Sequence, residues 1–290
     1  MTIYVGMDGS EGAAAAARWA VREGQLRQIP VTAVVAWDYL NQAASRGHEE
    51  FDPEYSEEDA LGLLRAWLVS AVGSAAADTV GRLSVCDLTW RALTAVSVEA
   101  DLLVVGARGT GGFLGLRIGS VSERVLEHAS CPVAVIHVDT RQQGASVAER
   151  IVVGVDGSAT SSRALAWALD EARARQAQVH LVSAWSVPIM VYPGAMEGAN
   201  IFEGAATEVL HAAVRDADVH GLTHPIKSET VAGGAASALI DAANDATLLV
   251  VGSRGLSRAR ELVFGSVSRQ VVHHAPCPVV VIQPDRRDTP

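Results

Sequence analysis

Two segments of the chain place glycines where a polypeptide can hold an anionic group. Residues 102–136 and 248–282 each contain an apolar run ending in glycine, an arginine-glycine turn and a Gly-Ser pair that opens a helical pattern. Two residues separate the first pair of glycines in both copies, and nine separate the second pair. These glycines are Gly106, Gly109 and Gly119 in the first copy, and Gly252, Gly255 and Gly265 in the second.

A strand that re-enters a helix through such a turn directs several backbone N–H groups at one point beside the helix N-terminus, which is suited to phosphate. Glycine is expected there because a Cβ would block close approach of a ligand and would disfavour positive φ. Ser120 and Ser266 are the predicted N-caps of the helices. Arg108 and Arg254 could neutralise a phosphate or remain solvated. A tight turn alone would account for one segment, but two copies with the same spacing favour a phosphate site.

Several other kinds of site are not supported by the sequence. Lys227 is the only lysine, so neither glycine segment is a Walker A P-loop, and neither matches the Rossmann dinucleotide fingerprint. Cys131 and Cys277 lie before strands and are predicted to be small buried groups, and the three cysteines contain no CxxC pair. The nine histidines show no metal-ligand spacing, which argues against a metal bound by protein side chains alone. The two segments share no candidate general base, so a strongly hydrolytic enzyme is not expected.

Length and composition indicate a globular protein of about two domains. The chain has 290 residues, of which 49% are hydrophobic and 19% charged. A formal charge of −10 argues against a nucleic-acid-binding surface, which depends on clustered Lys and Arg. No apolar run is long enough to span a membrane, and the N-terminus lacks the pattern of a signal peptide. We therefore expect a soluble cytoplasmic protein.

The chain is one domain duplicated. Asp8-Gly9-Ser10 recurs as Asp156-Gly157-Ser158, each after a short apolar strand, and the glycine segments repeat at nearly the same offset. The predicted domains are residues 1–138 and 150–285, joined by a polar linker at 139–149. The first copy is predicted to have strands at 2–7, 31–37, 82–87, 101–106 and 133–138, and helices at about 11–27, 56–76, 89–99 and 120–129.

Strands that alternate with helices and are apolar throughout predict a parallel sheet with helices on both faces. The expected fold class is α/β, with two tandem, doubly wound, Rossmann-like domains of five parallel strands. Ligands of such sheets bind beyond the carboxyl ends of the strands, where the strand order reverses. We expect the first strand and the glycine-segment strand to be neighbours there, which would bring Asp8 or Asp156 to the same crevice. These carboxylates could accept hydrogen bonds from an adenine amino group or a ribose hydroxyl, or cap the following helix.

The glycine spacing, together with the domain openings VGMDGS and VGVDGS, resembles the universal stress protein family. The resemblance covers nearly the whole chain twice, as in tandem-domain members. It implies that each domain binds ATP, that Mg²⁺ arrives with the nucleotide, and that the chain forms a homodimer through its last strands. It also implies a role in stress or growth control through a protein partner not yet known, with at most weak ATPase activity. Two alternatives stay open: an ATPase or nucleotidyl-transferring enzyme, and a binder of AMP or cyclic AMP.

The resemblance assigns ribose and phosphates to the glycines and the Gly-Ser-Val-Ser helix start, and adenine to the aspartate and a backbone segment of the second strand. The candidate binding residues of the first copy are Gly6, Asp8, Ala36, Gly106, Arg108, Gly109, Gly111, Gly112, Gly119, Ser120, Val121 and Ser122. Those of the second copy are Gly154, Asp156, Ala184, Gly252, Arg254, Gly255, Gly265, Ser266, Val267 and Ser268.

The copies differ just before the glycine-segment strand. Gly233 can make the turn that the family expects in the second copy, whereas Asp87 stands at the aligned position of the first. Trp90 follows in the next helix, where it could fill the crevice, stack on a base or point into the core. The two sites are therefore expected to differ in affinity.

Overall fold

The computed structural model describes residues 1–38, 54–109, 118–138, 149–187, 196–255 and 264–284. The chain divides into two compact units, Met1–Thr140 and Arg141–Pro290. Residues 139–148 of the predicted linker lie outside the described residues. Glu149, the last residue of that linker, forms an ion pair with Arg175 at 3.3 Å within the second unit.

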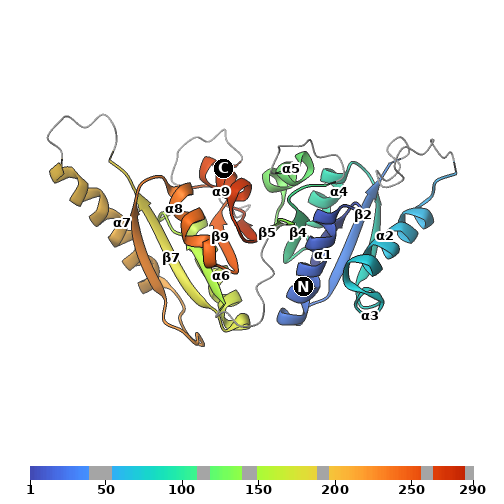
Figure 1. Cartoon of the computed structure of the whole chain (residues 1–290), viewed down its shortest axis with the longest axis horizontal. Coiled ribbons are helices and arrows are strands. Elements are labelled where there is room, and N and C mark those ends of the chain that lie inside the picture. The colour runs from blue at the N-terminus through green and yellow to red at the C-terminus, as the bar shows by residue number, and fades with distance from the viewer. Residues whose placement is uncertain (39–53, 110–117, 139–148, 188–195, 256–263, 285–290) are drawn as a thin grey trace. The chain divides into compact units, whose positions relative to one another are not determined.

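The described part of the first unit alternates strands with helices along the chain (Figure 1). Its elements are β1 (Ile3–Met7), α1 (Glu11–Arg27), β2 (Val31–Trp37), α2 (Glu57–Val72), α3 (Ser74–Ala77), β3 (Gly81–Cys86), α4 (Thr89–Val96), β4 (Leu102–Gly106), α5 (Ser120–His128) and β5 (Val133–Ile136).

The second unit repeats this order without a counterpart of α3 among its described residues. Its elements are β6 (Arg150–Gly154), α6 (Ala159–Arg175), β7 (Gln178–Trp185), α7 (Met196–Asp216), β8 (Lys227–Ala232), α8 (Ala235–Ala242), a 3-10 turn at Ala243–Asp245, β9 (Leu248–Gly252), α9 (Ser266–His274) and β10 (Val279–Ile282). No helix in the described part of the chain is both long enough and apolar enough to cross a membrane.

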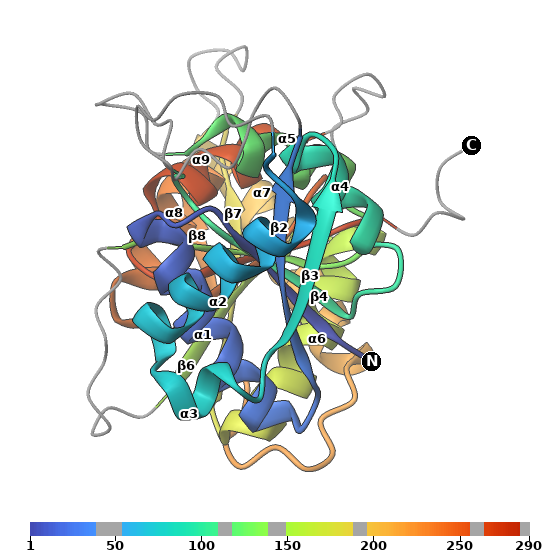
Figure 2. The same ribbon diagram turned by 90° about the vertical axis from the view of Figure 1, so that its right-hand side faces the viewer.

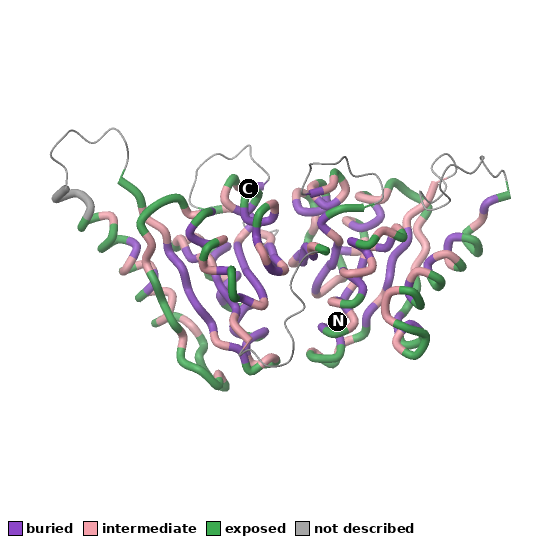
Figure 3. The backbone as a smooth tube through the Cα atoms, in the orientation of Figure 1, coloured by how far each residue is buried: buried purple, intermediate pink, exposed green. Residues whose placement is uncertain are grey.

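Each unit contains a parallel sheet with helices on both faces (Figures 1 and 2). The strand order is β3-β2-β1-β4-β5 in the first unit and β8-β7-β6-β9-β10 in the second. The first four residues of β4 and of β9 are all buried, as the tube in Figure 3 shows along the central strands. Helices cover both faces of these strands, which explains why their sequences are apolar without alternation. The predicted doubly wound fold is confirmed.

The order of strands reverses beside β1, which lies between β2 and β4. Ile3 is in register with Leu102 of β4 on one side and with Val31 of β2 on the other. In the second unit β6 has the same position, with Ile151 in register with Leu248. The predicted adjacency of the first strand and the glycine-segment strand is therefore correct, and both end at the same edge of the sheet.

The helix predicted at residues 56–76 is broken. Gly73 has a φ of 82°, which a right-handed helix does not accommodate, so α2 ends at Val72 and α3 begins at Ser74. In contrast, the predicted end of α1 at Arg27 is correct. The Gly73 break was missed because an isolated glycine in a helical pattern is usually tolerated.

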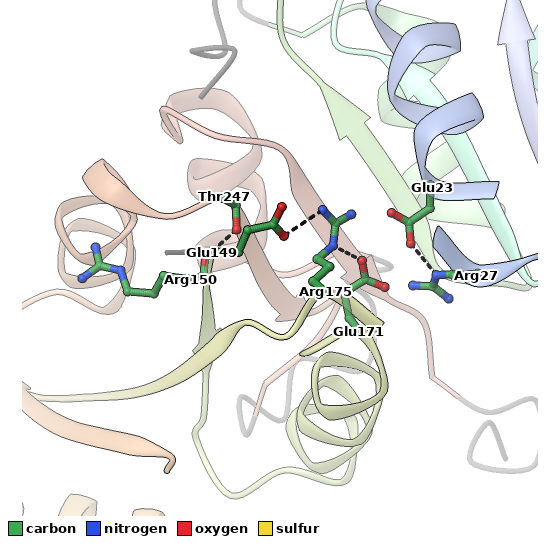
Figure 4. A network of polar contacts seen from close by, with 7 residues as sticks. All are labelled: Glu23, Arg27, Glu149, Arg150, Glu171, Arg175 and Thr247. Atoms are coloured by element: carbon green, nitrogen blue, oxygen red, sulfur yellow. Dashed lines mark hydrogen bonds and ion pairs between the residues drawn. The ribbon is translucent and has the colours of Figure 1, made fainter. Parts of the chain in front are cut away.

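Each unit buries a glutamate near the end of its first helix (Figure 4). Glu23 is 0% exposed and accepts a hydrogen bond from the Arg27 guanidinium one turn later. Glu171 is 1% exposed and accepts from Arg175, which also reaches Glu149. A buried carboxylate needs such a partner because desolvation of an isolated charge is costly.

Cys131 and Cys277 are both buried, at equivalent positions before β5 and β10. Burial raises the pKa of each thiol to about 12, so both stay protonated at neutral pH. This confirms the interpretation of these cysteines as small buried groups, because a thiol that is not ionised is a poor nucleophile.

Candidate functional site

The glycine turn after β4 is fixed by two backbone hydrogen bonds. The N–H of Ala107 donates to the carbonyl of Ile136 at the end of β5, at 2.7 Å, and the carbonyl of Ala107 accepts from the N–H of Gly119, also at 2.7 Å. These bonds hold the start of α5 directly beside the end of β4. The second unit has the same two bonds at 2.8 Å each, among Ser253, Ile282 and Gly265.

Two of the three glycines in each segment are required by the packing of the protein itself. A Cβ on Gly109 would overlap the Oδ2 atom of Asp8, and a Cβ on Gly255 would overlap the Oδ2 atom of Asp156. A Cβ on Gly106 would overlap the backbone of Gly12 in α1. A Cβ on Gly252 would come within 2.9 Å of the Thr160 side chain in α6.

The third glycine differs between the two units. A Cβ on Gly119 would make only ordinary contacts, the nearest at 3.6 Å to the carbonyl oxygen of Ala107, whereas a Cβ on Gly265 would lie 3.1 Å from the carbonyl oxygen of Ser253, which is a tight contact. None of the six glycines of the two segments has a positive φ, so the expectation that they adopt left-handed backbone is wrong. The close approach of the aspartates is the reason that remains for glycine at Gly109 and Gly255, whereas a Cβ would fit at Gly119 without overlap.

The start of α5 is not capped by a side chain. Gly119 is the N-cap of α5 and Gly265 that of α9, and neither helix has a side-chain cap hydrogen bond. Ser120 and Ser266 are the first helical residues, so their predicted role as N-caps is wrong. The first amides of a helix have no intrahelical acceptor, and within the described residues no capping side chain supplies one here. An anion could therefore accept from the amides of Ser120, Val121 and Ser122 in the first unit, and of Ser266, Val267 and Ser268 in the second.

A serine hydroxyl in the first turn ties each helix to its strand. The Ser122 hydroxyl donates to the Gly106 carbonyl at 2.7 Å, and the Ser268 hydroxyl donates to the Gly252 carbonyl at 2.6 Å. Both serines are buried. Their hydroxyls therefore hold the first turn of the helix against the end of the strand, which fixes the direction of its amides.

Asp8 and Asp156 lie beside the same glycine turns. Oδ1 of Asp8 accepts a hydrogen bond from the Ser10 N–H at 3.0 Å, and Oδ1 of Asp156 accepts from the Ser158 N–H at the same distance. The following helices are capped by Ser10 and Ser158, whose hydroxyls accept from backbone N–H groups at 3.1 Å. The aspartates therefore do not cap these helices, and their Oδ2 atoms face Gly109 and Gly255.

The remaining candidate residues lie around the glycine turns or outside the described part of the chain. Ala36 is in register with Val85 near the end of β2, one strand away from β1, and Ala184 occupies the matching position in β7. Arg108 is exposed and Arg254 partly exposed. Gly111 and Gly112 lie outside the described residues.

Gly6 and Gly154 are explained by packing against a helix. A Cβ on Gly6 would come within 3.1 Å of Leu93 in α4, and one on Gly154 would come within 3.0 Å of Leu239 in α8. These contacts are tighter than most real Cβ contacts, so a side chain would push the helix away from the strand. Both glycines thus position the helix that follows the third strand of each unit.

Sequence reasoning missed three glycines that shape the site. Gly9 and Gly157 have φ values of 80° and 82°, which favour glycine, and they form the turn between each aspartate and its capping serine. Gly12 lets α1 approach the glycine turn, since a Cβ there would overlap the Arg108 carbonyl. The repeated Asp-Gly-Ser sequence was a usable signal for the first two, whereas Gly12 has Thr160 at its counterpart and gave none.

The structure also places the residues that distinguish the copies. Gly233 has a φ of 132°, which Asp87 does not share. The Trp90 ring lies between α4 and α5, with its centroid 5.4 Å from the His128 ring and 5.2 Å from the guanidinium carbon of Arg124. Trp90 is partly exposed, so it packs on the outside of α5 and does not point into the core.

Comparison with known proteins agrees with this arrangement. The model of the universal stress protein family matches residues 1–137 and 148–283. A universal stress protein of Mycobacterium tuberculosis (strain ATCC 25618 / H37Rv) is 33% identical over 288 residues, covering 96% of this chain and 95% of that protein. One of Mycolicibacterium smegmatis is 31% identical over 294 residues, covering 97% of each. The crystal structure of a universal stress protein from Archaeoglobus fulgidus shares the fold, with a TM-score of 0.63 at 18% identity over 97% of this chain and 98% of that one. The chain therefore belongs to the universal stress protein family, with one family domain in each half.

Proposed function

We propose that each unit binds one adenine nucleotide, ATP with its Mg²⁺, and that the chain acts as a nucleotide-regulated module of stress or growth control. The observation that carries this proposal is, in each unit, a helix start without a side-chain cap beside the end of the glycine-segment strand. Ser10 caps α1 and Ser158 caps α6, whereas α5 and α9 begin at a glycine with no side-chain cap. Uncapped N-terminal amides beside a glycine-ended strand are a favourable place for phosphate.

The proposed contacts follow from the geometry of each unit. The amides of the first turn of α5 would hold phosphate oxygens, and Gly119, which has no side chain, would let them approach. Asp8, beside Gly109, would accept from a ribose hydroxyl or the adenine amino group, and the backbone near Ala36 would complete the adenine site. Arg108 is exposed and can reach a phosphate bidentately. The second unit would use the equivalent residues.

Mg²⁺ would be held mainly by the phosphates. Among the described residues, no group of three or more His, Cys, Asp or Glu side chains could hold a metal ion. Mg²⁺ commonly binds through substrate phosphates with few protein ligands, so this arrangement suits a metal that enters with the nucleotide.

Nucleotide retention tests the proposal directly. We expect mass spectrometry of the supernatant released from the heated, purified protein to detect an adenine nucleotide, and added ATP to bind the stripped protein. If the supernatant contains none and the stripped chain binds neither ATP, AMP nor cyclic AMP, the proposal is wrong. Competition among these three ligands decides which one the sites prefer, because fewer phosphates need fewer amide contacts.

An ATPase or nucleotidyl-transferring enzyme is the alternative. A turnover assay with Gly252→Ala and Asp156→Ala as controls distinguishes it from a binding module. Sustained release of phosphate or pyrophosphate that both substitutions reduce would establish the enzyme, whereas bound nucleotide without turnover supports the regulatory function.

We also propose that the chain forms a homodimer through β5 and β10, the last strands of the two units, as the family resemblance suggests. Sedimentation equilibrium should then give twice the mass of the chain, and a monomer at micromolar concentration would contradict this.

A further inference from the structure

A cluster of cationic and aromatic side chains lies on the surface formed by α4 and α5, outside the proposed nucleotide site. The guanidinium carbons of Arg91 and Arg124 lie 5.4 and 5.2 Å from the centroid of the Trp90 ring. The His128 ring is 5.4 Å from the same indole. The two helices lie side by side on one face of the first unit's sheet (Figures 1 and 2). We call Trp90, Arg91, Arg124 and His128 the α4–α5 patch.

The guanidinium groups of the patch are not neutralised within the part of the chain that the structure describes. Arg91 and Arg124 are exposed, and neither forms an ion pair or a side-chain hydrogen bond there. Their positions are instead set by the indole, since a cation over an aromatic face is attracted by about 0.5–1 kcal/mol at an exposed site. The patch thus holds two cations in place while leaving their N–H donors open to a partner.

The second unit lacks this surface. The residues aligned with Trp90, Arg91 and Arg124 are Ala236, Ser237 and Gln270, and only His274 keeps its type. Ala236 is 6% exposed and carries no ring on which a guanidinium could stack. The fold therefore does not require the patch, because the same pair of helices packs without it in the other half of the chain.

We propose that the α4–α5 patch is a docking site for a short acidic segment of another protein. Two guanidiniums within 5.4 Å of one ring centroid can be reached by two carboxylates of one short segment. Each guanidinium can bind a carboxylate bidentately, and Trp and Arg are among the side chains enriched at the energetic centres of interfaces. Leu88, which is 45% exposed just before α4, adds apolar surface for a neighbouring side chain.

The charge of the whole chain favours a peptide over a nucleic acid. The formal charge is −10, so a polynucleotide lying across the patch would meet repulsion from the surrounding surface along its whole length. A short acidic segment with an apolar residue can bind within the patch and so avoids most of the negatively charged surface around it. The partner we infer is therefore a protein that presents two or more carboxylates beside an aromatic or aliphatic side chain.

The test uses the full chain and a short fluorescein-labelled peptide that alternates Glu with Leu, with its Glu-to-Gln version as the neutral probe. We expect the acidic peptide to bind and the neutral peptide to bind at least roughly tenfold more weakly. The variant Arg91→Ser/Arg124→Gln, which introduces the residues of the second unit, should weaken binding of the acidic peptide at least roughly tenfold. Both changed residues are exposed, so the melting temperature should stay the same.

The matched control is Arg18→Gln/Arg82→Gln, which removes the same charge from exposed arginines elsewhere in the first unit. Its affinity for the acidic peptide should equal that of the unchanged chain. Equal losses in the two double variants would overturn the proposal, because the attraction would then depend only on net charge. A Trp90→Ala variant that is folded but binds as before would also overturn it. The proposal would also be overturned if an oligonucleotide displaced the labelled peptide more strongly than the unlabelled acidic peptide does, and lost this effect in the Arg91→Ser/Arg124→Gln variant.

Discussion

The two units keep the same backbone at the proposed nucleotide site and change the side chains around it. In both, a serine of the first turn donates to the carbonyl of the glycine that ends the strand, at 2.7 Å in the first unit and 2.6 Å in the second. The neighbours differ: the glycine turn packs against Gly12 in the first unit and against Thr160 in the second. The glycines and the serine are therefore enough to fix the direction of the amides at the helix start. The side chains around them can differ between the units, and with them the stability and the ligand affinity of each unit.

The largest expected difference between the units concerns the buried ion pairs. Arg175→Met should lower the free energy of unfolding by about 3–5 kcal/mol, because Glu171 would lose a partner in a buried environment. Arg27→Met should cost less, since the Arg27 side chain is 19% exposed whereas that of Arg175 is 6% exposed and also pairs with Glu149. Urea unfolding, with hydrogen exchange to assign each unit, measures both. A larger loss in Arg27→Met would contradict this account.

The glycines of one segment should respond differently to an added methyl group. Gly119→Ala should leave the melting temperature nearly unchanged, because the new Cβ would make only ordinary contacts. It should still weaken nucleotide binding in the first unit by roughly tenfold, about 1.4 kcal/mol, because the methyl group would occupy space needed by the phosphate. Gly109→Ala should affect both stability and affinity, since Asp8 would have to move. Calorimetric titration and thermal unfolding of both variants separate these effects. An unchanged nucleotide affinity in Gly119→Ala would mean that no phosphate binds at this position.

A smaller effect is expected from Ser253, whose hydroxyl is buried without a hydrogen-bond partner in the part of the chain that the structure describes. Its counterpart in the first unit is Ala107. Ser253→Ala should stabilise the second unit by about 1 kcal/mol, because an unsatisfied buried polar group is removed. Ala107→Ser is the matched reverse change and should destabilise the first unit by a similar amount. Chemical unfolding checks both, and destabilisation by Ser253→Ala would mean that the hydroxyl has a favourable role.

The smallest expected difference depends on pH. Burial, together with the charge of Lys227, lowers the pKa of His180 below its ordinary value, against the opposing effect of Glu229. The unfolded chain, with a histidine pKa of about 6.5, then binds more protons than the folded chain just below that pH. Stability should therefore fall as pH drops below about 6.5, by at most about 1.4 kcal/mol per pH unit for one proton.

The variant His180→Thr, which introduces the residue found at Thr32 of the first unit, tests this dependence. It should flatten the decline of the melting temperature between neutral and mildly acidic pH. A decline equally steep in the variant and in the unchanged chain would assign the pH dependence to other groups.

Most of the fold could be predicted because the sequence pattern and the structure share the same physical cause. Apolar runs such as LLVVG are buried on both sides in β4 and β9, and alternation with helices leaves few topologies. The duplicated glycine spacing predicted the two glycine turns, because the backbone itself forms them. Ends of elements were less certain, as the break at Gly73 shows.

What the sequence could not provide depends on contacts between residues far apart in the chain. The N-cap at Gly119 follows from a hydrogen bond to Ala107, which no local pattern indicates. The direction of Trp90 depends on Arg124 and His128 in a different helix. The site's closest packing, between Gly12 and the Arg108 carbonyl, also joins two distant segments.

The central claim is that the uncapped helix starts of both units hold nucleotide phosphates. Calorimetric titration of the stripped chain with ATP and Mg²⁺ measures this through the number of sites per chain. The account predicts two sites, one of which is lost in Gly109→Ala, the other in Gly255→Ala, and both in the double variant. Undiminished binding of ATP by the double variant, or no binding by the unchanged chain at millimolar ATP, would contradict it.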